Sequence, residues 1–346
     1  MNKKIDVFKI IGFVIIFSLV FFYTSGVFLP KSRGKFSYLS KTETFYDQPE
    51  NSIDLLFFSD STFRHGISPL TMWQESGITG YVRATSRQDP MIAYSYLLES
   101  LKTQQPKLVV LDSSSLFSNY DIDVREPTYR EAVDYMRFSM AKIQLVMEIL
   151  SESETQTLSS YIFPLLRYHS RWKEIELEDL KYIKNDGYDH FRGHTLLLEN
   201  IAQEIPQDYM LPTDTMAGYN ERALAYHQKT IQLCQEKGIE VVYLELPGFD
   251  RSTYAQHLGA KQMAEKYGLL FIDFSMPEIF DVVGFDPSTD MSDANHLNTF
   301  GAQKFSRHLA AILDEEFNLP DKRNVPGYEQ WDVDLQYFLS LLSGAN

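Results

Sequence analysis

The sequence predicts an α/β fold with a parallel sheet, and three observations support that prediction. Short apolar runs alternate with helical patterns along most of the chain. The runs are apolar at nearly every position, which is typical of strands buried on both faces. The first three runs each end in small polar residues, as strands do where an open α/β sheet binds its ligands. The expected strands are 53–58, 80–84, 107–111, 239–244 and 269–274.

Helical patterns lie between these strands, as in right-handed βαβ units. The first begins at Pro69 and ends before Gly77, the residue types that favour a helix start and a helix stop. The last follows the final strand and carries apolar residues at helical spacing. The expected helices are Pro69–Glu75, Met91–Lys102, Tyr219–Lys237, Ser252–Tyr267 and Thr299–Phe317.

Residues 116–217 interrupt the alternation and show helical patterns without strand signals. Such an insertion at the strand ends predicts a cap or lid beside the site. Within it, apolar residues recur at three- and four-residue steps, which predicts one helix face packed on the core rather than a cofactor site. These residues are Ala132, Met136, Met140, Ile143, Met147 and Leu150.

Residues 10–29 are apolar and carry no charge, and about 20 such residues are enough for a helix to cross a bilayer. Ser25-Gly26-Val27 is a poor cleavage site, so we expect an uncleaved, single-pass anchor in the cell membrane. Basic residues flank the span on both sides, so the positive-inside rule leaves the orientation open. The expected organisation is an N-terminus (1–9), an anchor (10–29), a stem (30–51), an α/β domain (52–318) and a C-terminal tail (319–346).

The composition excludes several classes of function. The net charge of −15 argues against a nucleic-acid partner, which needs clustered Lys and Arg. Cys234 is the only cysteine, so neither an intrachain disulfide nor a cysteine-based metal site can form. His190 and His194 are four positions apart, but Gly193 weakens a helix there and no third ligand is evident. We therefore expect no metal and no other cofactor.

The candidate nucleophile is Ser61, which follows the first strand in the run S-D-S-T. A serine hydroxyl is a weak nucleophile at neutral pH and needs a histidine base held by a carboxylate. Asp293 and His296 are three positions apart before the last helix, close enough to hydrogen-bond on one turn. Asp293 as a simple cap of the following helix is the alternative.

Taken together, a serine after the first strand and the run D-A-N-H-L-N-T-F-G-A-Q-K-F at 293–305 resemble the SGNH (GDSL-like) esterase and acyltransferase superfamily. Further similarity lies at 66–69, Gln88, 108–112 and 164–172. This set looks like a membrane-anchored bacterial branch associated with O-acylation or alanylation of cell-surface polymers.

The resemblance implies a flavodoxin-like three-layer parallel sheet, with Ser61 as nucleophile, His296 as base and Asp293 as its orienting carboxylate. It also implies an extracytoplasmic catalytic domain and therefore a cytoplasmic N-terminus. The implied partners are an acylated cell-surface polymer and a membrane-bound O-acyltransferase.

The chain departs from the family pattern in the blocks that build the oxyanion hole. Ser59 stands where the first block has glycine, and Asp112 and Ser113 stand where the third has asparagine. The glycine of the second block is replaced by Ala84 or Thr85.

Donors for an oxyanion hole are still expected from backbone N–H groups at Ser61 and near Thr85, with the Gln88 or Arg87 side chain. Arg87 could also hold an anionic substrate. Two functions stay open. One is serine-dependent acyl transfer or ester hydrolysis on a cell-envelope glycan or teichoic-acid-like polymer. The other is a catalytically silent protein that binds a polymer or an assembly partner.

Overall fold

The computed structural model describes residues 3–30, 38–181 and 187–344. Its centre is a five-stranded sheet in which every neighbouring pair is parallel, with the order β2-β1-β3-β4-β5. This is the flavodoxin-like, doubly wound strand order, and it confirms the predicted fold class. The strands are β1 Leu55–Ser59, β2 Gly80–Ala84, β3 Leu108–Asp112, β4 Glu240–Glu245 and β5 Leu270–Asp273.

Both faces of the sheet are covered, because successive strand residues point to opposite sides and nearly all are apolar. Leu56 and Phe58 belong to a core shared with α5 (Pro90–Ser100) and α11 (Glu221–Lys237). Leu55 and Phe57 belong to a second core, shared with α14 (Thr299–Phe317). The result is a three-layer helix–sheet–helix arrangement.

Most helix ends follow from local sequence signals. Ser68 caps α4 (Pro69–Ser76) through a hydrogen bond from the Thr71 N–H group, and Gly77 ends this helix in the left-handed region at φ 67°. The expected strands and helices outside the insertion match the observed ones to within about two residues, the usual uncertainty of helix and strand ends. The other elements in this part of the chain are α3 Ser61–Gly66, α12 Tyr254–Tyr267, η4 Pro277–Ile279, α13 Phe280–Val283, β6 Met291–Asp293 and β7 His296–Leu297.

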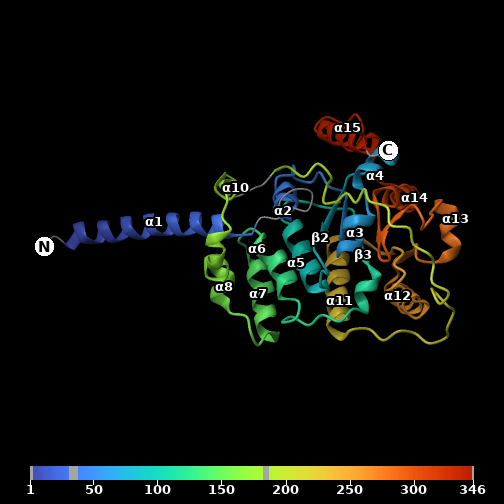
Figure 1. Cartoon of the computed structure of the whole chain (residues 1–346), viewed down its shortest axis with the longest axis horizontal. Helices are drawn as coiled ribbons and strands as arrows, with labels where there is room; N and C mark the ends of the chain where they lie inside the picture. The colour runs from blue at the N-terminus through green and yellow to red at the C-terminus, as the bar shows by residue number, and fades with distance from the viewer. Residues whose placement is uncertain (1–2, 31–37, 182–186, 345–346) are drawn as a thin grey trace.

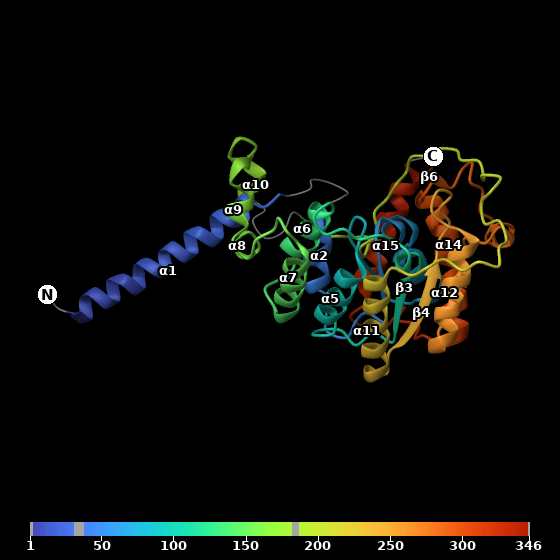
Figure 2. The same ribbon diagram turned by 90° about the horizontal axis from the view of Figure 1, so that it is seen from below.

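The insertion begins with a helical part, which lies beside the first helix, α1 (Lys3–Phe28), and at the same end of the domain (Figures 1 and 2). Helix α3 in Figure 1 and strand β6 in Figure 2 lie toward the other end, so these helices do not form the expected lid. The elements are α6 Glu126–Asp134, α7 Met140–Glu152, α8 Leu158–Ile162, α9 Pro164–Tyr168, η3 His169–Lys173 and α10 Leu177–Lys181. The 3-10 turn η2 (Ser113–Leu116) comes before them, directly after β3.

The rest of the insertion is an extended segment that follows the edge strand β2. The Val82 N–H group donates to Arg192 O at 2.9 Å. Gly193 has φ +88°, and a Cβ there would lie 1.9 Å from Val82 O, so only glycine permits this approach. Farther along, the N–H groups of Thr195 and Ile201 bond to Arg64 O and Met291 O. This extended part therefore borders the elements that carry the candidate site.

The predicted stem is partly wrong, because residues 38–46 form helix α2 (Tyr38–Tyr46) against the sheet. Phe45 is fully buried, and its ring lies 5.0 Å from that of Tyr81. Lys41 is also buried and donates to His194 O at 2.7 Å. Because the buried face of α2 contains polar as well as apolar residues, its sequence lacks the apolar spacing that predicts a helix. Residues 31–37 of the stem lie outside the described residues.

The predicted C-terminal tail contains a packed helix, α15 (Glu329–Ser343). The ring of Trp331 lies 5.3 Å from that of Trp73 in α4, and Asp334 accepts a hydrogen bond from Arg192 Nη2 at 2.6 Å. The α/β domain thus continues beyond residue 318. The partners that stabilise this helix are distant in the chain.

The predicted packing of the methionine stripe is confirmed at Ala132 and Met136, which are buried in the core, and is wrong at Met140 and Met147. The stripe spans two helices, because α6 ends at Asp134 and Ser139 caps α7. Met140 and Met147 are exposed, while α7 buries a different face. That face consists of Ala141, Leu145, Val146 and Ile149.

Candidate active site

Ser61 lies just beyond the carboxyl end of β1, at the first residue of α3. Asp60 is the cap of α3, and its Oδ1 accepts hydrogen bonds from the Thr62 N–H group at 2.9 Å and the Thr62 hydroxyl at 2.8 Å. This local pairing sets the turn between strand and helix. The half-buried Ser61 thereby stands at the edge of the sheet where doubly wound folds bind their ligands.

Strands β6 and β7 form a small antiparallel pair whose turn carries the two other candidate residues. Asp293 Oδ1 accepts hydrogen bonds from the backbone N–H groups of Asn295 at 2.8 Å and His296 at 2.9 Å. The His296 ring then lies against the same carboxylate, with Nδ1 2.8 Å from Oδ2 and 3.0 Å from Oδ1. The short D-x-x-H spacing thus forms locally.

Ser61 and His296 meet across the fold, with Ser61 Oγ 2.7 Å from His296 Nε2. Because the Asp293 carboxylate can only accept when ionised, it favours a proton on His296 Nδ1. Nε2 is then free to accept the Ser61 hydroxyl proton. The structure therefore brings together all three residues that the sequence proposed for a triad.

The Asp293 carboxylate of this cluster is ionised in an open, partly buried site. The Asp293 side chain is 53 % exposed and that of His296 26 % exposed. Partial burial alone would raise the pKa of Asp293, but hydrogen bonds from Asn295 N–H and His296 outweigh it and lower that pKa. At neutral pH, Asp293 is therefore a carboxylate that can orient the imidazole.

Asn298 stabilises the β6–β7 turn through hydrogen bonds to the segments on either side of it. Its Oδ1 accepts from the N–H groups of Phe300 and Gly301, both at 3.0 Å, and caps α14. Its Nδ2 donates to Thr289 O at 2.7 Å, and the residue is fully buried. One side chain therefore links the start of α14 to the segment that leads into β6.

His65 contacts the candidate base, and sequence reasoning missed it. Its ring lies 5.4 Å from the His296 ring at an interplanar angle of 85°. Its Nδ1 lies 3.1 Å from Thr195 O and its Nε2 3.3 Å from Arg64 Nη2. Burial, with the charge of Arg64, lowers the pKa of His65 to about 2, so the ring stays neutral. Its position four residues after Ser61, on the same helix face, was the available signal.

The residues proposed as oxyanion donors form a closed turn of their own. Gln88 Oε1 accepts from the backbone N–H of Thr85 at 3.0 Å and from its hydroxyl at 3.1 Å. Gln88 Nε2 donates to Arg83 O at 3.1 Å. Arg87 is exposed on this turn with φ 47°. A ligand would have to displace Gln88 Oε1 to reach the Thr85 N–H group, whereas a helix leaves its first N–H groups, such as that of Ser61, without an intrahelical acceptor.

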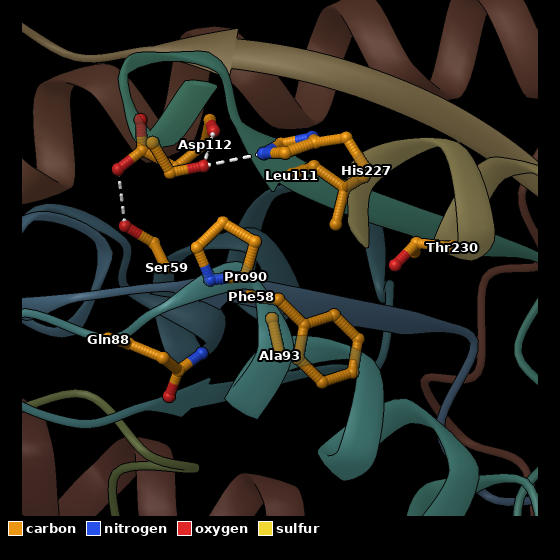
Figure 3. Close-up of a pocket in the computed structure, with 10 residues that line it drawn as sticks. Phe58, Ser59, Gln88, Pro90, Ala93, Leu111, Asp112, His227 and Thr230 are labelled. Atoms are coloured by element: carbon orange, nitrogen blue, oxygen red, sulfur yellow. Dashed lines mark hydrogen bonds between the residues drawn. The ribbon is translucent and has the colours of Figure 1, made fainter. Parts of the chain in front are cut away.

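Two positions that depart from the family pattern contact each other. The Ser59 hydroxyl donates to Asp112 Oδ2 at 2.6 Å, as Figure 3 shows. In the sequence resemblance, Ser59 stands where the family pattern has glycine and Asp112 where it has asparagine, so one hydrogen bond joins these two positions. The buried Asp112 carboxylate therefore accepts its hydrogen bond from the Ser59 hydroxyl.

A charge cluster adjoins the residue after Ser61, and sequence reasoning missed it. Arg251 Nη1 donates to Thr62 Oγ1 at 2.5 Å, and its Nη2 lies 3.9 Å from Glu245 Oε1. Burial, together with the negative charge of Asp112, raises the pKa of Glu245 to about 8. The Ser113 hydroxyl donates to Glu245 Oε2 at 2.5 Å. The carboxyl end of β4 thus holds a carboxyl group of raised pKa, which Arg251 links to Thr62, the residue after the candidate nucleophile.

The pocket in Figure 3 lies between the ends of β1 and β3 and helices α5 and α11. It is lined by residues that include Ser59, Asp112 and His227, and its free space is only about 20 Å³. That is room for about one water molecule. Ser61 and His296 are not among its lining residues, so this pocket is separate from the candidate triad. Among the described residues, no group of three metal-ligating side chains lies together.

No protein-family model matches this chain, and no curated protein matches its sequence. Among solved structures, it is similar to a proposed acylhydrolase from Bacteroides fragilis, with 10 % identity, 79 % of this chain and 94 % of that one covered, and a TM-score of 0.38. A proposed lipolytic protein of the G-D-S-L family from Desulfitobacterium hafniense shows 11 % identity, coverage of 75 % and 99 %, and a TM-score of 0.35. BT4096, a gut microbial diltiazem-metabolizing enzyme, shows 12 % identity, coverage of 77 % and 48 %, and a TM-score of 0.25.

These similarities are distant. The class that can be stated from the molecule itself is a doubly wound α/β protein with a Ser–His–Asp cluster at the carboxyl edge of its sheet.

Proposed function

We propose that this protein is a membrane-anchored serine esterase or acyltransferase that works through an acyl-enzyme on Ser61. The observation that carries the proposal is the hydrogen-bonded line from Ser61 Oγ to His296 Nε2, at 2.7 Å, and from His296 Nδ1 to Asp293 Oδ2, at 2.8 Å. Nucleophile, base and orienting carboxylate are each within hydrogen-bond reach of the next.

The chemistry follows from this line. Ser61 Oγ attacks the acyl carbonyl carbon while His296 Nε2 takes the hydroxyl proton, and the carbonyl electrons move to the oxygen. When the tetrahedral intermediate collapses, the C–O bond to the leaving alcohol breaks and His296 returns the proton to that alcohol. A second hydroxyl, from water or an acceptor, then loses its proton to His296 and attacks the carbonyl carbon of the acyl-Ser61 ester. The bond from that carbon to Ser61 Oγ breaks, and His296 returns the proton to Ser61 Oγ. No cofactor is needed for these steps.

The substrate we propose is an acylated cell-envelope glycan or teichoic-acid-like polymer. The Asp293 side chain is 53 % exposed, so the site is open enough for a hydroxyl on a long chain. The site elements lie toward the end of the domain away from α1 (Figures 1 and 2), which suits an acceptor that extends from the membrane. Transfer is favoured over hydrolysis, because an anchored enzyme can be loaded by a membrane-bound O-acyltransferase.

The proposed location is the outer side of the cell membrane. Helix α1 contains a span at Val7–Phe28 that is long and apolar enough to cross a bilayer. An extracytoplasmic domain follows from the family resemblance, since the flanking charges do not decide the orientation.

A specific observation favours the second candidate, a silent polymer-binding protein. The Thr85 N–H group and the Gln88 side chain are used within their own turn rather than left for an oxyanion. Removing one oxyanion-hole donor costs on the order of 10²–10³ in rate. A chain that lacks this donor could therefore keep a binding role alone.

The full-length protein in detergent tests the proposal with p-nitrophenyl acetate as acyl donor. We expect turnover and an acetyl adduct on Ser61 by mass spectrometry, both lost in Ser61→Ala and kept in the control Ser288→Ala, which changes an exposed serine near β6. Acetylation of added glycerol phosphate would indicate transfer, and release of acetate alone would indicate hydrolysis. If wild type and Ser61→Ala show equal, negligible turnover and no adduct forms, the enzyme proposal is wrong and the silent alternative stands.

A further inference from the structure

Short helices of the insertion expose a group of large apolar side chains next to the end of α1. Each is at least 39 % exposed, although soluble surfaces rarely gather so many such residues. We call residues 158–180, in α8, α9, η3 and most of α10, the platform. The exposed apolar residues are Leu158, Ile162, Phe163, Leu166, Trp172, Leu177 and Leu180.

The platform is joined to α1 by specific contacts. The Phe163 ring meets the Phe21 ring edge-on, with centroids 5.3 Å apart. Arg171 Nη1 donates to Phe28 O at 2.6 Å, at the last residue of α1. In both views the green helices α8 and α10 lie at the end of blue α1 (Figures 1 and 2). The exposed apolar surface is therefore continuous with the helix proposed to cross the membrane.

From these contacts we propose that the platform lies in the interfacial region of the same bilayer, as a second membrane attachment. This inference rests on the proposed anchoring by α1. Phe21 precedes Phe28 by seven residues, which is about 10 Å along a helix. If residues 10–29 span a hydrocarbon layer of about 30 Å, Phe163 reaches below its surface. Apolar faces of interfacial helices lie about 5–10 Å deep, at this level.

The side chains of the platform suit a lipid interface. Trp172 is exposed and has the Lys173 ammonium 5.3 Å from its ring. Tryptophan prefers the headgroup level, and lysine can extend its charge to water. Glu174 and Glu176 lie in the same segment, so attraction to anionic lipid is weak and apolar burial supplies the binding. The occupant we assign is therefore the bilayer itself.

A second attachment changes what the anchor does. A single spanning helix attaches the domain to the membrane at one point only. Contact through the platform fixes the end of the domain that carries α8 and α10 against the membrane. The elements α3 and β6, at the candidate site, lie toward the other end (Figures 1 and 2), so the site is held at a fixed height above the bilayer.

Single nitroxide labels on the full-length protein in phosphatidylcholine liposomes test the platform. Labels are placed at Leu166→Cys in the platform, Phe13→Cys in α1 and Val282→Cys in α13, all exposed positions. The native Cys234 is fully buried and does not compete for the label. Paramagnetic resonance then compares collisions with oxygen, which concentrates in lipid, and with a water-soluble nickel complex. We expect lipid-like values at Phe13→Cys and Leu166→Cys, and water-like values at Val282→Cys.

The labels separate the two ways of failing. If the label at Phe13→Cys is in lipid and that at Leu166→Cys is in water, the platform is wrong and the anchor stands. If the label at Phe13→Cys is in water, the proposed anchoring fails and the platform with it.

Tryptophan emission gives a second measurement without cysteine changes. Trp73 and Trp331 are buried, so brominated phosphatidylcholine should quench mainly Trp172. We expect this quenching to be lost in Trp172→Phe, and equal quenching of the variant would contradict the proposal.

Discussion

Replacing Asp293 by asparagine tests the triad, because it changes the charge and the proton pattern while keeping the shape. The amide oxygen can still accept from the N–H groups of Asn295 and His296, at 2.8 and 2.9 Å in the wild type, so the turn should form. The amide NH₂ then faces His296 Nδ1 and favours a proton on Nε2. With that proton in place, Nε2 cannot accept from Ser61.

The size of the effect follows from the exposure of the site. Two unit charges about 4 Å apart interact by about 1 kcal/mol in water and about 4 kcal/mol near a protein surface. The Asp293 side chain is 53 % exposed, so the loss of its charge lies between these limits. At about 1.4 kcal/mol per tenfold change, that is roughly 5- to 10³-fold in rate. The tautomer change adds to this, and the same exchange in a serine-protease triad lowers kcat about 10⁴-fold. We expect kcat for p-nitrophenyl acetate to fall by about 10²- to 10⁴-fold.

The control is Asp250→Asn, a neighbouring carboxylate whose Oδ2 lies 3.3 Å from Asn295 Nδ2. It removes a charge from the same surface without changing the hydrogen bond to His296 Nδ1, so kcat should stay within about threefold of wild type. Unchanged circular dichroism would show that both variants fold. The triad assignment is refuted if Asp293→Asn keeps the wild-type rate, or if Asp250→Asn loses as much.

Two further predictions concern stability. Asn298→Ala removes the α14 cap and the bond to Thr289 O, so urea unfolding should show a loss of about 2–4 kcal/mol; a loss below about 0.5 kcal/mol would contradict the role of Asn298. Glu245 has a pKa of about 8 when folded and 4.5 as its ordinary value, so the folded state holds an extra proton between these values and loses stability as pH rises through them. Glu245→Gln lacks that loss, so its Tm relative to wild type should increase from pH 5 to 8 and then level off. An equal Tm difference at pH 5 and pH 8 would show that burial does not raise this pKa.

Much of the fold could be predicted because the sheet strands are encoded by short, continuous apolar runs. A strand such as Leu55–Ser59 is buried on both faces, so its sequence needs no partner to be recognised. Asp293 and His296 were equally accessible, since their pairing forms within one turn. Ser61 could be predicted as a site residue because it lies in the polar run that directly follows β1, at the carboxyl end of a buried strand.

The failures concern elements whose burial depends on distant parts of the chain. Helix α2 buries Lys41, whose ammonium donates a hydrogen bond to His194 O. A buried lysine breaks the apolar spacing by which a packed helix is recognised in the sequence. Helix α15 packs its Trp331 on Trp73, and nothing near residue 331 shows that this surface exists. The methionine stripe keeps helical spacing from 132 to 150, although α6 ends at Asp134 and a new helix, α7, begins after Ser139. The spacing of apolar residues does not show that the chain leaves one helix and starts another.

The sequence by itself determined the parallel sheet, the apolar N-terminal span and the identity of the Ser61, His296 and Asp293 candidates, because each is a local pattern of residue types. Only the tertiary structure decided that Ser61 Oγ and His296 Nε2, 235 positions apart in the chain, lie 2.7 Å apart. It also placed His65 against the candidate base, closed the Thr85–Gln88 turn and joined the platform to α1. The physical reason is that each of these depends on which surfaces the packed sheet brings together. A distance between distant residues is set by the whole core, and no short stretch of sequence contains it.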